Sequence, residues 1–242
     1  MEAVREAAEI LRDDAAALMP TLLKDCRQID WIYNPLEYAW APHEEWIRRF
    51  AGNGAQTLLV GMNPGHGMGN TGVPFGCPEQ VREFLGIMDL DVRQPSPAHP
   101  KRVVYGLDCP KPEVSGRRIW SFLAEHYETP EAVSEDIYIV NHCPLWMFND
   151  AGQNITPDKL TGSAAERLNE ICNRHLRTVV AEMGITRVIG VGRYAQRQAA
   201  ALFNEVEVDW VPHPLSLIHI PRPHGRLGVH SQGDGRWYPA TR

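Results

Sequence analysis

Four short apolar segments recur along the chain, separated by longer stretches with helical spacing. Each segment is rich in β-branched residues and is bounded by Gly, Asn or Pro, a pattern typical of strands that are buried on both faces of a sheet. The four predicted strands are residues 57–62, 137–143, 187–192 and 206–211.

Amphipathic patterns predict helices before and between these strands. The longest covers residues 156–183, where apolar side chains fall on one stripe. Thr156 and Pro157 offer a cap and a first-turn proline, and Gly184 follows the last turn. The other predicted helices are residues 1–28, a short stretch from about His43, residues 116–126 and residues 193–203.

The alternation of strands and helices predicts an α/β fold with three layers, in which helices cover both faces of a central, mainly parallel four-stranded sheet. We expect residues 1–242 to form a single domain of this kind. Functional sites in such sheets gather at the carboxyl ends of the strands. The residues expected to converge on that edge are Asn63, Asn141-His142, Gly192-Arg193 and His213-Pro214.

The composition is that of an ordinary globular protein, with 43% hydrophobic and 22% charged residues. No apolar run approaches the roughly 18–20 residues needed to span a bilayer, and the acidic N-terminal stretch lacks the pattern of a signal peptide. We therefore expect no membrane partner and a cytoplasmic location, or a nuclear one in a eukaryote. The five cysteines include no C-x-x-C pair, which argues against a disulfide framework, a zinc site and an iron–sulfur cluster.

Charge is unevenly distributed along the chain. The net charge is −6, yet residues 187–242 hold seven arginines against four acidic residues, together with four histidines. A polyanion would be attracted to this C-terminal quarter rather than to the whole surface. A merely solvated surface with uneven charge is the plainer interpretation of this feature alone.

A glycine-dense loop follows the first predicted strand and runs from Gly61 to Gly76. Such loops can hold phosphates through exposed backbone N–H groups, but no Gly-Lys-Ser/Thr follows, so this is not a P-loop. With Phe75 near its end, the loop could instead hold a flat ring, with backbone donors at the edge of the ring and the aromatic side chain on its face. A role for Phe75 as a core anchor of the loop is the alternative.

Asn141 and His213 stand at two other strand ends. The amide of Asn141 offers one acceptor and two donors, which match the edge of an imide or amide base, although an asparagine there is more often a cap or turn residue. His213 could act as a general acid or stabilise negative charge, but it is one of ten histidines. Their expected convergence with Asn63 and Phe75 favours a site over a packing role.

Seven motifs stand in order between about Trp31 and Pro214. They are Tyr33-Asn34-Pro35-Leu36-Glu37-Tyr38-Ala39-Trp40-Ala41-Pro42-His43, Gly61-Met62-Asn63-Pro64-Gly65, Thr71-Gly72-Val73-Pro74-Phe75-Gly76, His99-Pro100-Lys101-Arg102, Val114-Ser115-Gly116-Arg117, Asn141-His142-Cys143-Pro144-Leu145 and Gly190-Val191-Gly192-Arg193. Together they closely resemble the motifs of the single-strand-selective monofunctional uracil-DNA glycosylases. This resemblance implies the fold of the uracil-DNA glycosylases.

The resemblance also implies a role for each residue of the expected site. Asn63 would position the attacking water, and His213 would steady the charge on the departing base. Phe75 would stack on the flipped base, and Asn141 would bind its pyrimidine edge. The base-binding set implied in this way is Met62, Gly65, Phe75 and Asn141, and the implied DNA-binding set is Lys101, Arg117, Arg193, Pro214 and Ser216.

The chain departs from the family pattern in two places. Residues 66–70 are one residue shorter than in the family and lack its Pro-Phe pair, which puts the acceptance of 5-substituted uracils in question. After Pro214, the usual Ser-Pro and Asn-rich stretch is replaced by Leu-Ser-Leu-Ile-His-Ile. We expect residues 215–242 to be an atypical, irregular tail, either a DNA-contacting loop or a foreign junction that weakens activity on duplex DNA.

The sequence therefore predicts a monofunctional DNA glycosylase that hydrolyses the N-glycosidic bond of uracil, or of a 5-substituted uracil, in single- and double-stranded DNA and so starts base-excision repair. We expect a monomer that needs no cofactor and no metal, and whose partner is DNA with uracil or a related damaged base. Two alternatives stay open. One is a nucleic-acid binder of the same fold with impaired catalysis, and the other is a glycosylase for deaminated purines such as xanthine or hypoxanthine.

Overall fold

The computed structural model of the chain describes residues 1–111 and 113–214. At its centre, a four-stranded parallel sheet has the order β3-β2-β6-β7. All four predicted strands are confirmed, each to within two residues at either end. They are β2 Thr57–Gly61, β3 Ile137–Asn141, β6 Arg187–Val191 and β7 Glu207–Val211.

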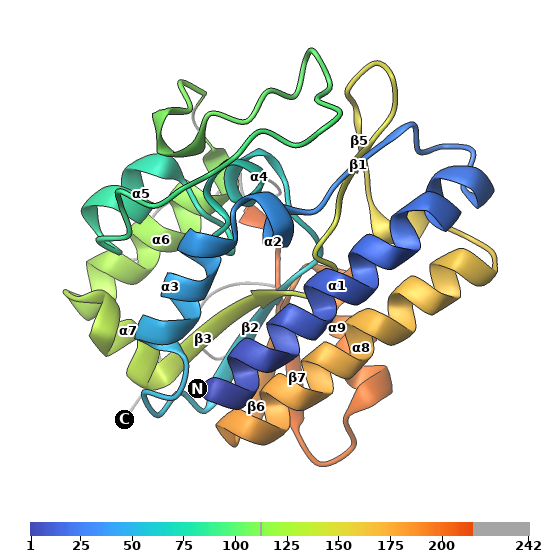
Figure 1. Cartoon of the computed structure of the whole chain (residues 1–242). Helices are drawn as coiled ribbons and strands as arrows, with labels where there is room; N and C mark the ends of the chain where they lie inside the picture. Colours follow the sequence, from blue (N-terminus) through green and yellow to red (C-terminus); the bar gives the residue numbers. More distant parts are fainter. Residues whose placement is uncertain (112, 215–242) are drawn as a thin grey trace.

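Two long helices, α1 Glu2–Asp25 and α8 Ser163–Met183, lie side by side in front of the strands (Figure 1). The prediction for residues 156–183 is wrong at its start. Thr156 and Pro157 open a 3₁₀ turn, Pro157–Lys159, and α8 begins only after the extended Leu160. A proline suits the first turn of either helix type, so the cap pattern did not fix where the long helix begins. Its end at Gly184 is as predicted.

Shorter helices fill the connections between the strands. The predicted helices at 116–126 and 193–203 are confirmed with small shifts as α6 Val114–Tyr127 and α9 Arg193–Leu202. The short helix expected from about His43 begins three residues earlier, as α3 Trp40–Phe50. The remaining helices are α2 Pro35–Tyr38, α4 His66–Thr71, α5 Pro78–Glu83, α7 Pro130–Asp136 and the 3₁₀ turn Gly106–Asp108.

A second, antiparallel sheet has no counterpart among the predicted elements. It consists of β1 Trp31–Tyr33, β4 Trp146–Phe148 and β5 Asn154–Ile155, in the order β1-β4-β5. Its aromatic side chains pack edge to face, with the Tyr33 ring centroid 4.9 Å from that of Phe148 and 5.8 Å from that of Trp146. Strands of two or three residues are too short to show a periodic pattern, which is why the sequence does not predict them.

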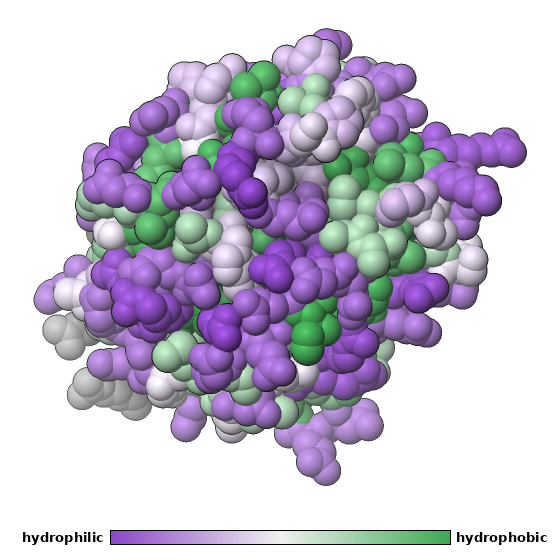
Figure 2. Space-filling view, viewed as in Figure 1, coloured by the Kyte–Doolittle hydropathy of each residue, from purple (hydrophilic) through white to green (hydrophobic). Residues whose placement is uncertain are grey.

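The main apolar core lies between the central sheet and its helices. Trp46 of α3 stacks on Tyr138 of β3, with ring centroids 5.5 Å apart and an interplanar angle of 11°. Side chains of α1, α3, α6, α8 and α9 join those of the sheet in one continuous cluster, which confirms the predicted α/β class. In Figure 2, apolar side chains reach the surface in separate groups set among polar ones.

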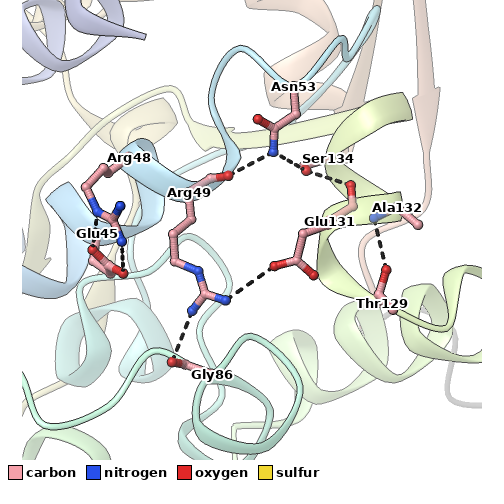
Figure 3. A network of polar contacts seen from close by, with 9 residues as sticks. All are labelled: Glu45, Arg48, Arg49, Asn53, Gly86, Thr129, Glu131, Ala132 and Ser134. Carbon is pink, nitrogen blue, oxygen red and sulfur yellow. Dashed lines mark hydrogen bonds and ion pairs between the residues drawn. The ribbon is translucent and has the colours of Figure 1, made fainter.

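A polar network fixes α3 against α7 and the loop after α5 (Figure 3). Arg49 donates to the Gly86 carbonyl at 3.1 Å and to the Glu131 carboxylate at 3.3 Å. Asn53 bridges the Arg49 carbonyl and the Ser134 hydroxyl, both at 2.8 Å. Within residues 1–111 and 113–214, none of the helices combines the length and the apolar character required to cross a membrane.

Candidate active site

The carboxyl ends of the strands bring the predicted site residues to one edge of the sheet. Gly61 and Asn141 are paired in the parallel register of β2 and β3, and just beyond this pair the Cys143 N–H donates to the Met62 carbonyl at 2.9 Å. At the other two strands, a Cβ placed on Gly192 would lie 3.9 Å from the Cβ of His213. Asn63 and Asn141 thus follow neighbouring strands, as do Gly192 and His213.

The glycine-dense segment is not an open loop throughout, because residues 66–71 form the short helix α4. Two of its side chains bond back to the preceding turn, Asn70 to the His66 carbonyl at 2.8 Å and Thr71 to the Gly67 carbonyl at 3.1 Å. The Asn70 side-chain oxygen in turn accepts the Tyr105 N–H at 2.7 Å. The segment that follows Asn63 is therefore held in a defined conformation.

The orientation of the Asn63 amide is set by two backbone carbonyls. Its Nδ2 donates to the carbonyls of Leu145 at 3.2 Å and Pro64 at 3.1 Å. Because the amide group is planar, its Oδ1 points away from these two carbonyls. A half-buried amide oxygen held in this way can accept a hydrogen bond from a water molecule and orient it.

Asn141 is buried, with 7% of its surface exposed. Its Nδ2 contacts the sulfur of Met68 at 3.1 Å, while its Oδ1 is buried without a hydrogen-bond partner among the described residues. An unpaired buried acceptor costs about 1–3 kcal/mol. Such an atom calls for an explanation, and a ligand N–H that pairs with it when bound provides one.

Phe75 and Asn141 meet over the backbone of Gly61. A Cβ at Gly61 would lie 2.6 Å from the Cζ of Phe75 and would overlap the Oδ1 of Asn141. Phe75 itself has a φ of 52°, in the left-handed region that a residue with a side chain rarely adopts. An aromatic ring and an amide edge are thus brought together at the end of β2, an arrangement suited to a flat, polar heterocycle. A glycine within a strand often marks such a close approach, and this signal could have singled out Gly61.

Met62 and Gly65 flank Asn63 and are both half-buried. The Met62 carbonyl accepts the Cys143 N–H at 2.9 Å, which ties Met62 to the end of β3. At Gly65, an added Cβ would meet no atom of the other described residues within 4 Å, chain neighbours aside, so these residues leave open space beside the backbone there.

His213 follows β7 and is half-buried. Burial lowers its pKa, so the imidazole is neutral at pH 7. A neutral imidazole offers one N–H donor, and such a donor beside a site can stabilise an anion that forms there.

His142, at the end of β3, has a structural role instead. Its Nε2–H donates to the Asn173 oxygen at 2.8 Å, and its Nδ1 accepts from the Tyr194 hydroxyl at 3.1 Å. Burial lowers its pKa to about 4. These bonds tie the sheet edge to α8 and α9, so His142 is a scaffold residue next to Asn141.

The predicted DNA-binding residues differ in exposure and in their hydrogen-bond and charge partners. Lys101 and Arg193 are exposed, and the guanidinium of Arg193 lies 3.6 Å from the ring centroid of Trp210. Arg117 is paired with Glu79 at 2.6 Å, so a phosphate would have to compete with a carboxylate for it. The Pro214 carbonyl accepts a hydrogen bond from Arg118, a contact that no sequence pattern predicts. Ser216 and the predicted irregular tail lie outside the described residues.

A metal site has no candidate in the part of the chain that the structure describes. No group of three or more His, Cys, Asp or Glu side chains there could hold an ion.

Comparisons with known proteins show the family of the whole chain. The model of the Uracil DNA glycosylase superfamily matches residues 49–238. The single-strand selective monofunctional uracil DNA glycosylase of Bos taurus is 43% identical over 188 residues, which cover 76% of this chain and 69% of that protein. The chain belongs to the single-strand selective monofunctional uracil DNA glycosylases. The member of this family in Rattus norvegicus is 42% identical, and the match covers 76% of this chain and 67% of that protein.

Membership of the single-strand selective glycosylases confirms the predicted family and enzyme class, a DNA glycosylase that hydrolyses N-glycosyl bonds. The fold agrees as well. The wild-type Pedobacter heparinus SMUG2 crystal structure superimposes with a TM-score of 0.57 at 20% identity, covering 84% of this chain and 88% of that one. The three-layer α/β arrangement with a parallel four-stranded sheet is thereby confirmed as that of a uracil-DNA glycosylase-like protein.

Proposed function

We propose that this glycosylase removes uracil from single- and double-stranded DNA by hydrolysis, with Asn63 and His213 at the reacting centre. The observation that carries the proposal is the unpaired buried oxygen of Asn141 beside the Phe75 ring. A base inside a duplex cannot reach a buried amide of this kind, so it has to leave the stack first. The flipped base would lie against Phe75 with its Watson–Crick edge toward Asn141.

Asn141 would select uracil over cytosine. Uracil presents an N3–H donor and an O4 acceptor, which match the unpaired Oδ1 and the second hydrogen of Nδ2. Cytosine presents an acceptor at N3 and an amino group at C4, so both contacts would be mismatched, at about 1–3 kcal/mol for each buried unpaired group. The contact of Nδ2 with the Met68 sulfur favours this orientation of the amide over the reversed one that would accept cytosine.

Asn63 and His213 would divide the hydrolysis between them. Water held by the Asn63 oxygen adds to C1′ of the sugar as the C1′–N1 bond breaks, and the bonding electrons leave with uracil as an anion. The neutral His213 would donate its N–H toward the uracil O2, where that negative charge develops. Removing a donor of this kind typically costs about 2.7–4 kcal/mol of transition-state stabilisation. The water proton is finally lost to solvent. Because water and not a lysine amine attacks C1′, no lysine adduct is formed.

The test is excision from a defined oligonucleotide. The protein is incubated with single-stranded DNA that holds one uracil, and abasic sites are then cleaved with alkali. We expect strand cleavage at the uracil position, and cleavage of the duplex substrate as well. A parallel panel with 5-hydroxymethyluracil, xanthine and hypoxanthine defines the base range. The absence of cleavage at high enzyme concentration, with DNA binding intact, would instead support a binder with impaired catalysis.

A further inference from the structure

Glu113 is a half-buried carboxylate that the proposed chemistry leaves without a role. It is the N-cap of α6, and its side chain accepts the backbone N–H of Gly116. Burial raises its pKa. Capping carboxylates are usually solvated, so the enclosure of this one points to a second task beyond ending a helix.

The Glu113 side chain is wedged between α6 and the segment that carries Phe75. A Cβ at Gly67, in the first turn of α4, would lie 2.6 Å from the Cγ of Glu113 and would also overlap the Gly76 carbonyl. The stem of Glu113 therefore packs directly on α4, next to the turn at Gly76. Glu113 therefore contacts α4, which begins three residues after Asn63, and lies beside Gly76, which follows Phe75.

The first turn of α6 packs directly against the backbone of Phe75. A Cβ at Gly116 would overlap the Phe75 carbonyl oxygen and would lie 2.7 Å from the Oε2 of Glu113. The bond that Glu113 makes to the Gly116 N–H thus fixes the residue on which the Phe75 backbone rests. Since Phe75 has a φ of 52°, its conformation persists only if its surroundings impose it.

We propose that Glu113 is a positioning residue that holds Phe75, and with it the aromatic face of the base pocket, in place. It acts through the first turn of α6 and through α4, and it does not touch the base. The inference rests on the proposed function in one respect only, namely that the Phe75 ring stacks on the substrate.

A double-mutant cycle on uracil excision tests the proposal. Glu113→Ala lowers kcat/KM roughly 10-fold to 100-fold, the range for a displaced positioning group. Because its effect passes through Phe75, the variant with both Glu113→Ala and Phe75→Ala is no slower than Phe75→Ala alone. Glu113→Gln keeps most of the activity, because an amide oxygen can accept the same bond.

The matched control is Thr129→Ala, which removes the equivalent N-cap bond of α7, from the Ala132 N–H to the Thr129 hydroxyl at 3.2 Å. Uracil excision by Thr129→Ala is unchanged at a temperature where Thr129→Ala and Glu113→Ala are both folded. Additive losses in the cycle, a Glu113→Gln as slow as Glu113→Ala, or an equal loss in Thr129→Ala would each overturn the proposal.

A second readout does not depend on activity. Protein labelled with 4-fluorophenylalanine gives a ¹⁹F signal for Phe75, which is assigned with Phe75→Leu. Glu113→Ala shifts or broadens this signal, whereas Thr129→Ala leaves it in place. An unchanged signal in Glu113→Ala would contradict the proposal. If the wild type released no uracil, the proposed function would fail while this measurement still decided the role of Glu113.

Discussion

At the scale of single residues, the site is defined by which atoms already have partners. The Asn63 nitrogen is engaged by two carbonyls, whereas the Asn141 oxygen is buried and unpaired among the described residues. The sequence could predict that both asparagines stand at strand ends, since that follows from the strand pattern. It could not predict the orientation of each amide, because the hydrogen-bond partners of the two Nδ2 groups, the Leu145 carbonyl and the Met68 sulfur, come close only in the folded structure.

This difference predicts that the Asn141 side chain contributes little net stability to the free protein. Asn141→Ala should abolish uracil excision but change the free energy of unfolding by less than about 1 kcal/mol, because the loss of an unpaired buried acceptor offsets the lost packing. Urea denaturation with an excision assay measures both effects.

The matched control for that measurement is Asn173→Ala. Asn173 carries the oxygen that accepts the His142 Nε2–H at 2.8 Å, so its removal leaves a buried donor unpaired. We expect it to cost about 1–3 kcal/mol of stability. An Asn141→Ala that is destabilised as strongly as Asn173→Ala would show that the Asn141 side chain has a structural role.

At the scale of elements, length and periodicity decided what could be predicted. Strands β2, β3 and β6 were predicted because each is a mostly apolar run, whereas β7 was predicted although Glu207 and Asp209 interrupt its apolar residues. The helix α4 was missed because Gly67 and Gly69 disfavour a helix, and side-chain bonds from Asn70 and Thr71 compensate for them. The start of α8 was misplaced because the 3₁₀ turn Pro157–Lys159 opens with the same Thr-Pro pattern.

Contacts between elements should matter more for stability than contacts within one. Arg49 joins α3 to α7 and to the Gly86 carbonyl, and its side chain is 26% exposed. Among the described residues, neighbouring Arg48 pairs only within its own helix, with Glu45, and is 61% exposed. We expect Arg49→Ala to cost about 1 kcal/mol and Arg48→Ala less than about 0.5 kcal/mol. Thermal unfolding of the two variants measures both losses. Equal losses of stability would show that the contacts of Arg49 between elements, drawn in Figure 3, contribute no more than the contact of Arg48 within its helix.

At the scale of the whole molecule, buried histidines couple folding to pH. Burial lowers the pKa of His43 to about 4, of His142 to about 4 and of His175 to about 3. These side chains come from α3, from the end of β3 and from α8. A histidine with a lowered pKa in the folded state stays neutral there while the unfolded chain takes up a proton near pH 6.5.

Stability should therefore be fully present above pH 6.5 and fall as the pH drops toward 4. Each histidine contributes a slope of up to about 1.4 kcal/mol per pH unit in that window. Urea denaturation at pH 7, 5.5 and 4.5 measures the loss, and His175→Gln should flatten it. An unfolding free energy that stayed constant from pH 7 to 4.5 would show that these groups do not control acid stability.

The most direct test of the central claim is a single-turnover measurement of free uracil released from a single-stranded oligonucleotide, with wild type and Asn63→Ala side by side. We predict that Asn63→Ala lowers the rate at least about 100-fold, because it removes the positioning of water. DNA affinity, measured by fluorescence anisotropy, should be nearly unchanged. Equal rates for the two proteins, or no uracil release by the wild type at enzyme excess, would contradict the account.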